Sequence, residues 1–112
     1  MKLSKENIIN LEDFRVHGAK VFTGRDRGED VRKASNIDNI EATYDEVNII
    51  IPINVYAINP SFFEEFFLNA VLKLGREGFL KKFKFVSEGS FNYEKPLFEA
   101  IDRILRQKTA LG

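Results

Sequence analysis

The sequence predicts an α/β domain, a mixed β-sheet of about four strands with about three helices packed on it. Two observations carry this prediction: an apolar run over residues 47–55 leads directly into a sharp helix start at Asn59-Pro60-Ser61, and a second strand-then-helix pattern follows over residues 82–106. A chain of 112 residues has room for one domain and one core, with loose termini expected at 1–5 and 107–112.

The first third of the chain predicts two short strands and a helix. Residues 6–11 and 19–23 are apolar or β-branched runs, which indicate two strands joined by a hairpin or a loose turn. Residues 24–30 open a helix that we expect to run to about Asn39, because acids near its start and the pair Arg32 and Lys33 suit the helix dipole.

Residues 45–56 form the strongest strand pattern. Five residues of this segment are expected to face one way, which is typical of a strand that buries one face: Val47, Ile49, Ile51, Ile53 and Val55. Pro52 cannot donate to a ladder, so we expect a bulge or an early end of pairing there. The strand is expected at or near the centre of the sheet.

The next segment predicts a helix with a wide phenylalanine stripe. Its apolar residues are Phe62, Phe63, Phe66, Phe67, Ala70, Val71 and Leu74. Ser61 and Glu64 have the spacing of a capping box, and Gly75 or Gly78 is expected to end the helix.

Residues 82–87 alternate, with Phe83 and Phe85 expected inward and Lys82 and Lys84 outward. A closing helix is expected to begin between Glu94 and Leu97.

Composition excludes several classes of function. Seventeen basic and seventeen acidic residues give no net charge, which disfavours binding to nucleic acid or to an anionic membrane. The basic patch around Lys81–Lys84 is interpreted as a solvated face, with local binding left as the alternative. Without cysteine there is no disulfide or thiolate site, and no run approaches ~18 apolar residues, so a cytoplasmic protein is expected.

Two motifs resemble a known family. Residues 24–32 read Gly-Arg-Asp-Arg-Gly-Glu-Asp-Val-Arg and residues 58–66 read Ile-Asn-Pro-Ser-Phe-Phe-Glu-Glu-Phe. They are similar to the elements of the STAS-like domain family of uncharacterised function, small prokaryotic and phage proteins. The resemblance covers roughly residues 7–106, although Ile51-Pro52-Ile53 stands where that family tends to have an acidic-aromatic pair.

The resemblance implies a regulatory role for Ser61. In the related anti-sigma factor antagonists, a kinase with a GHKL-type ATPase fold phosphorylates a serine at the start of the corresponding helix, and Ser61 occupies that place. A helix N-terminus stabilises an anion, which suits a phosphoserine switch. Serine is also a preferred N-cap, so capping alone is the alternative, and Glu64 in the same turn would repel a phosphate.

Other candidate chemistry is sparse. Residues 23–28 suggest either an anion-binding loop or a plain surface turn. Alternatively, as the family resemblance implies, Arg25 and Arg32 clamp the helix to neighbouring loops. His17 is the only histidine and has no acid at ligand spacing, and no pair of acids is placed for acid-base work. We therefore expect that the protein is not an enzyme and that it has no catalytic residue, metal or cofactor.

The sequence thus predicts a non-enzymatic protein-protein interaction module. The expected partner-binding residues are Arg25, Arg27, Arg32, Asn59, Ser61 and Glu65. The partner is either a GHKL-type ATPase kinase or a phage or host-defence complex that the protein joins or inhibits by tight binding without phosphorylation. A small domain or enzyme for an anionic ligand is the alternative class, and homodimerisation is a further alternative.

Overall fold

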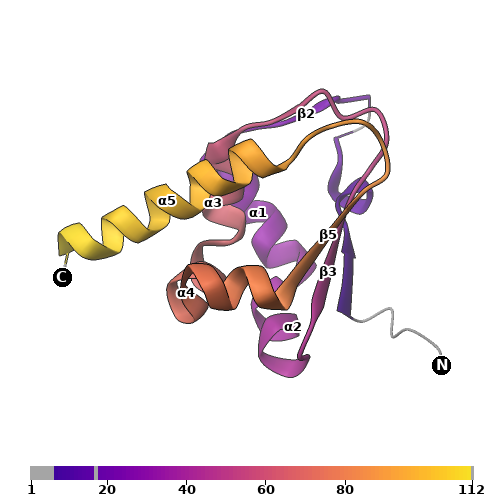
Figure 1. Cartoon of the computed structure of the whole chain (residues 1–112). Coiled ribbons are helices and arrows are strands. Elements are labelled where there is room, and N and C mark those ends of the chain that lie inside the picture. The colour runs from indigo at the N-terminus through magenta and orange to yellow at the C-terminus, as the bar shows by residue number, and fades with distance from the viewer. Residues whose placement is uncertain (1–6, 17, 112) are drawn as a thin grey trace.

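A computed structural model describes residues 7–16 and 18–111, with side chains up to Gln107. Within that part of the chain the elements are β1 (Ile8–Asn10), a 3₁₀ helix (Leu11–Phe14), β2 (Val21–Phe22), α1 (Arg25–Ser35), α2 (Ile37–Thr43), β3 (Val47–Ile51), β4 (Ala57–Ile58), α3 (Pro60–Phe66), α4 (Leu68–Lys82), β5 (Phe83–Ser87) and α5 (Glu94–Leu111). The predicted α/β class is confirmed (Figure 1).

The described strands form two small parallel sheets. One has the order β1-β3-β5 and the other pairs β2 with β4. The strand at Val47–Ile51 is therefore central, and it ends directly before Pro52, as expected of a residue that cannot donate to a ladder. Ile53, which was expected on the buried face, follows this end and is 57% exposed. The expected mixed sheet is wrong for these strands, and the hairpin alternative for the first two strands does not form, because each pairs with a later strand instead.

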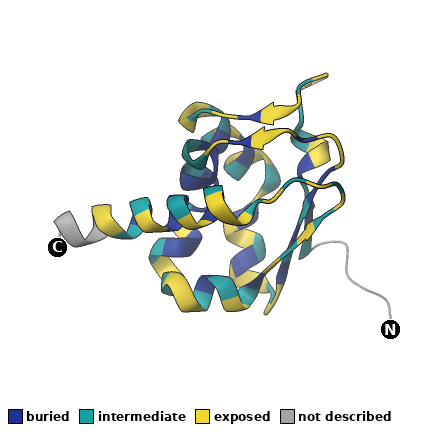
Figure 2. Ribbon diagram, turned by 45° about the horizontal axis from the view of Figure 1, so that its top comes forward, coloured by how far each residue is buried: buried dark blue, intermediate teal, exposed yellow. Residues whose placement is uncertain are grey.

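The helices cover one face of the three-stranded sheet (Figure 1). Ile9, Ile49 and Phe85 lie in one register row on that face, and Ile9 and Ile49 are buried. Side chains of the neighbouring rows point to the opposite face, where Val86 is 51% exposed. Figure 2 shows the buried residues gathered between the sheet and the helices, with α5 extending beyond this body.

The predicted helical stretches are present, and two of them are interrupted. Asn36 has a φ of 60° and separates α1 from α2. The first helical stretch, counted across this break, ends at Thr43 rather than near Asn39. Phe67 separates α3 from α4, and Gly75, expected to end the second stretch, instead interrupts α4 with a φ of 74°. The closing helix begins at Glu94, within the predicted range, and its backbone is helical to Leu111.

The phenylalanine stripe is the centre of the core, as predicted. Phe62, Phe63, Phe66 and Phe67 are all buried, and the ring centroids of Phe66 and Phe67 lie 4.6 Å apart. Phe rings bury a large apolar area without needing a polar partner. This cluster joins α3 and α4 to the sheet.

The start of α3 differs from the predicted capping box. The helix begins at Pro60, preceded by Asn59, whose side chain caps no N–H group. Proline at the first helical position has a suitable fixed φ and lacks the N–H that a cap would satisfy. Ser61 is therefore the second helical residue rather than the N-cap, and Glu64 turns into the interior.

Across the described residues, no helix combines the length and the apolar character of a membrane span.

Candidate functional site

Three of the predicted partner-binding residues lie on one helix, α1. Arg25, Arg27 and Arg32 belong to α1, which follows directly after Gly24 with its φ of 94°. Residues 25–28 are therefore helical, as the predicted helix opening requires, and form neither the anion-binding loop nor the surface turn that residues 23–28 suggested. The glycines there have other roles, since Gly24 supports the turn into the helix and Gly28 is buried inside it.

Gly28 allows α1 and α3 to pack closely. A Cβ atom added at Gly28 would overlap the carbonyl oxygen of Phe62 and come within 3.0 Å of the Cβ atom of Glu65. Only glycine leaves room for this approach. The contact places the arginines of α1 beside the acids of α3.

Two of these arginines clamp neighbouring segments. Clamping was an alternative prediction for Arg32, but its partner is helix α3 rather than a loop. Arg32 donates to the carbonyl oxygen of Glu65 at 2.5 Å and lies 3.5 Å from Oε1 of the same residue. Arg27 donates to the carbonyl oxygen of Phe14. These guanidinium groups are largely engaged within the fold.

Asn59 ties the end of β2 to the start of α3. Its backbone N–H donates to the carbonyl oxygen of Phe22 at 2.8 Å, and its amide donates to Oγ1 of Thr23 at 3.3 Å. Ser61 follows on α3 and is half-buried. His17 lies outside the described residues.

Glu64 is the residue that the sequence reasoning missed. Its side chain is only 1% exposed. Its Oε2 atom lies 3.0 Å from Nη1 of Arg25 and accepts from Nε2 of Gln107 at 3.2 Å. Its Oε1 atom has no hydrogen-bond donor among the described residues, and Nη1 of Arg103 lies 3.9 Å away. The hydrogen bond to Glu64 and the charge of Glu64 raise the pKa of Arg25.

A hollow of about 380 Å³, lined by polar and charged residues, lies over this carboxylate, where α5 crosses α3. We call it the Glu64 hollow, and its lining residues are Arg25, Glu64, Arg103, Arg106 and Gln107. The i, i+3 and i, i+4 spacings of the three α5 residues put them on one helix face, which is a signal visible in the sequence. The sequence does not reveal that this face meets α1 and α3.

Glu41 is a second buried carboxylate, and it uses part of the predicted basic patch. Lys73 donates to its Oε1 atom at 3.0 Å, and Lys82 donates to its Oε2 atom at 2.9 Å. Burial opposes ionisation, but the hydrogen bonds and charges of Lys82 and Lys73 outweigh it, so the pKa of Glu41 lies below its ordinary value. Lys82 therefore faces inward instead of outward, whereas Lys84 is exposed as predicted.

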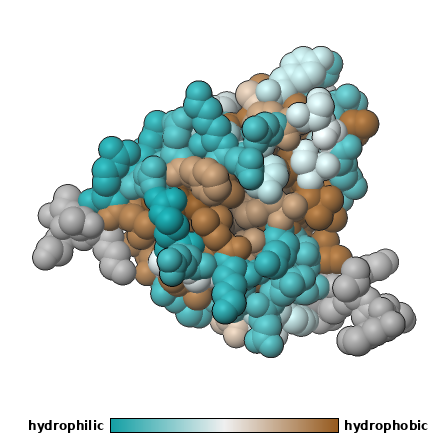
Figure 3. Space-filling view, in the orientation of Figure 1, coloured by the Kyte–Doolittle hydropathy of each residue, from teal (hydrophilic) through white to brown (hydrophobic). Residues whose placement is uncertain are grey.

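An apolar groove of about 320 Å³ lies between β5 and the first turns of α5. We call it the β5–α5 groove, and it is lined by Leu80, Phe83, Lys84, Phe85, Tyr93, Glu94, Leu97 and Phe98. Tyr93 stacks on Phe85 with ring centroids 5.0 Å apart, and burial and the charge of Glu94 raise its pKa. Figure 3 shows apolar surface in the middle of this face with hydrophilic residues around it.

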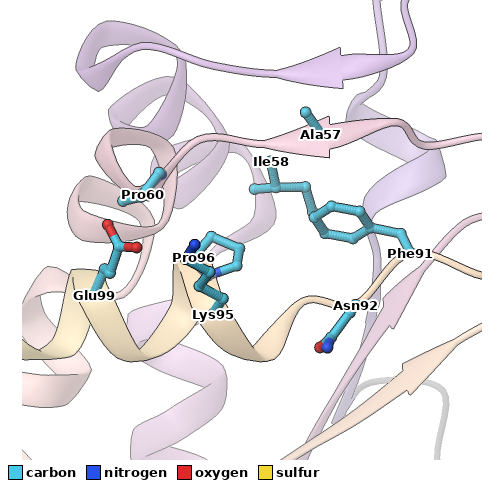
Figure 4. A pocket seen from close by; sticks show the side chains of 8 residues that line it. All are labelled: Ala57, Ile58, Pro60, Phe91, Asn92, Lys95, Pro96 and Glu99. Carbon is cyan, nitrogen blue, oxygen red and sulfur yellow. The ribbon is translucent and has the colours of Figure 1, made fainter.

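The other side of the same helix start borders a second apolar hollow, of about 390 Å³ (Figure 4). Ile58 of β4 and Phe91 point toward each other across it, and Pro60 and Pro96 form its wall toward the helices. Lys95 and Glu99 lie at its polar end. The first turns of α5 thus stand between two apolar hollows.

Comparisons of the chain with protein-family models, with curated proteins and with solved structures find no match. Among the described residues, no group of three or more histidine, aspartate or glutamate side chains is arranged to hold a metal ion.

Proposed function

We propose that the protein is a non-enzymatic binding module that takes an extended segment of a partner protein along the free edge of β5, with an apolar side chain of that segment in the β5–α5 groove. The observation that carries this proposal is the position of the groove, directly between an outer strand and a helix. Addition of a peptide strand to a sheet edge gains affinity from main-chain hydrogen bonds and specificity from side-chain pockets.

The outer edge of β5 offers main-chain groups to a partner. β5 pairs with β3 on one side only within the described sheet. The N–H of Glu88 donates to the carbonyl oxygen of Ile51 at 2.8 Å, so the even-numbered residues of β5 direct their backbone groups toward β3. Phe85 and Ser87 therefore direct their N–H and C=O groups toward the open edge.

The lining of the groove suits an apolar side chain between neutral backbone groups. Phe85 and Tyr93 are half-buried and Phe98 is 39% exposed, so aromatic surface is available at the mouth. Lys84 and Glu94 carry opposite charges on its walls, which favours neither an acidic nor a basic segment. Partly exposed aromatic groups beside an open strand edge are typical of partner-binding surfaces.

The proposed class of function is the one that the sequence predicts, but its location is different. Arg27, Arg32 and Asn59 hold the fold together, which leaves little of the predicted surface for a partner. The proposal needs no phosphorylation of Ser61.

The test is to pan a random peptide library against the whole chain and to measure binding of the selected peptides to the parent and to Phe98→Asp. A carboxylate at the mouth of an apolar groove should weaken these peptides by about tenfold or more. Bound peptide should also slow hydrogen exchange of the amides of Phe85 and Ser87.

Val86→Asp is the matched control, because Val86 lies on β5 and is exposed on the face opposite to that of Phe85. It should bind like the parent. Selected peptides that bind Phe98→Asp and the parent equally would place the partner site elsewhere, as would unchanged exchange at Phe85 and Ser87.

A further inference from the structure

We infer that the Glu64 hollow is a binding site for a phosphate group that presents an O–H donor, either hydrogen phosphate itself or a phosphate ester with an adjacent hydroxyl. This site is separate from the β5–α5 groove, and it would serve a small ligand rather than a polypeptide. The inference begins from the unsatisfied oxygen of Glu64 and the arginines that share its hollow.

The unsatisfied oxygen requires a donor. Oε1 of Glu64 is buried without a hydrogen bond from any described side chain, and Nη1 of Arg103 is 3.9 Å away, too far for one. A buried acceptor without a partner is costly, and in native proteins such an atom is usually satisfied by water or by a ligand. An O–H group in the hollow would meet this need.

The arginines require an anion. The hollow is lined by three positively charged side chains and one carboxylate: Arg25, Arg103 and Arg106, and Glu64. Glu65 and Glu99 approach Arg25 and Arg103 only at 3.8 Å each, so both guanidinium groups keep donors for a ligand. Planar guanidinium groups bind phosphate oxygens with paired hydrogen bonds.

The two requirements together define the ligand. A fully ionised oxyanion such as sulfate satisfies the arginines but places an acceptor against the carboxylate of Glu64. Hydrogen phosphate satisfies both, because it keeps one proton near neutral pH. The volume of about 380 Å³ exceeds the needs of a single ion and leaves room for a small ester such as glycerol 3-phosphate.

The experiment is calorimetric titration of the whole chain with inorganic phosphate, sulfate and glycerol 3-phosphate at neutral pH and equal ionic strength. Phosphate should bind about tenfold or more tightly than sulfate, because sulfate forfeits a hydrogen bond to a charged group. Tighter binding of glycerol 3-phosphate would assign the site to an ester, and tighter binding of inorganic phosphate would assign it to the free ion. Equal affinity for phosphate and sulfate, or no saturable binding of any of the three, would overturn the inference.

Variants separate the two halves of the site. Glu64→Gln supplies an amide donor where the carboxylate stood, so it should bind sulfate at least as well as phosphate. Arg106→Ala should weaken phosphate about tenfold or more and is expected to fold, because Arg106 is exposed. Lys33→Ala removes the same charge from an exposed position on α1 and should bind like the parent. An unchanged affinity of Arg106→Ala, with Lys33→Ala also unchanged, would show that phosphate binds outside the hollow.

Discussion

The two glutamates that are buried in the described part of the chain have the same chemistry and different surroundings. Glu41 has a donor for each carboxylate oxygen, from Lys73 and from Lys82. Glu64 has two partners at one oxygen, Arg25 and Gln107, and no donor among the described residues at the other. Both carboxylate oxygens of Glu41 thus accept hydrogen bonds within the fold, whereas the carboxylate of Glu64 borders a hollow.

One partner of Glu41 is more enclosed than either arginine beside Glu64. Lys82 is 20% exposed and the other partner, Lys73, is 57% exposed, whereas Arg25 and Arg103 beside Glu64 are 52% and 41% exposed. An unpaired charge that water can reach costs little free energy, whereas an unpaired enclosed charge costs much more. The comparison therefore separates a carboxylate that stabilises the fold from one that is available to a ligand.

The largest expected effect is that of removing the charge of Glu41. Glu41→Gln leaves the enclosed ammonium group of Lys82 without an anion and should lower the free energy of unfolding by about 3 kcal/mol. Glu64→Gln should cost only about 1 kcal/mol, because its arginine partners can be hydrated. Denaturant unfolding of both variants measures the difference, and equal losses would mean that the two sites are energetically alike.

A somewhat smaller effect is expected from Gly28→Ala, which disturbs the Glu64 site from a distance. The added methyl group overlaps the carbonyl oxygen of Phe62, so α1 must move away from α3 and Arg25 from Glu64. Overpacking of this kind should cost about 2 kcal/mol in the free energy of unfolding.

Gly78→Ala is the control for that substitution. Its added Cβ meets only the Cβ atom of Leu74, at 3.2 Å, and alanine is the better helix former. It should unfold within about 0.5 kcal/mol of the parent. A Gly28→Ala variant as stable as this control would contradict the close contact between α1 and α3.

Local sequence patterns were enough to predict much of the fold. The alternation at Val47, Ile49 and Ile51, the end of pairing before Pro52 and the phenylalanine stripe all follow from side-chain periodicity and backbone chemistry within a few residues. β4 was not predicted, because its two residues show no alternation of their own and are set by pairing with β2. The breaks at Asn36 and Phe67 likewise lack a strong local signal.

The candidate sites depended on contacts that local patterns do not contain. Glu64 was interpreted as part of a capping box, yet Pro60 moves the helix start and the packing of α1 and α5 on α3 buries the carboxylate. Gly28 was interpreted as part of a helix opening or of a loop, and its role in the helix contact depends on where Phe62 lies. Clamping by Arg32 was among the alternatives, but the expected contact was with a neighbouring loop rather than with α3.

Lowering the pH should remove part of the contribution of Glu41 to the free energy of unfolding. The loss should be smaller than that caused by Glu41→Gln, because protonated Glu41 keeps its place beside the lysines. The folded-state pKa of Glu41 lies below its ordinary value of 4.5, so its contribution is fully present above that value. It is lost as the pH falls through the lowered pKa. The difference in unfolding free energy between the parent and Glu41→Gln should therefore shrink below about pH 4.5, and a constant difference down to the acid limit would contradict this origin.

The smallest expected effect is that of Gln107→Ala, which tests how open the Glu64 site is. Gln107 donates to Oε2 of Glu64, an oxygen that keeps Arg25 at 3.0 Å, so its loss leaves no new unsatisfied atom. Alanine also has the higher helix propensity, which offsets part of the lost hydrogen bond. The free energy of unfolding should fall by only about 0.5 kcal/mol. Arg25→Ala, measured beside it, removes the stronger partner of the same oxygen and should cost about 1 kcal/mol. A Gln107→Ala variant that loses as much stability as Glu41→Gln would show that Glu64 belongs to an equally closed network, and the distinction between the two carboxylates would fail.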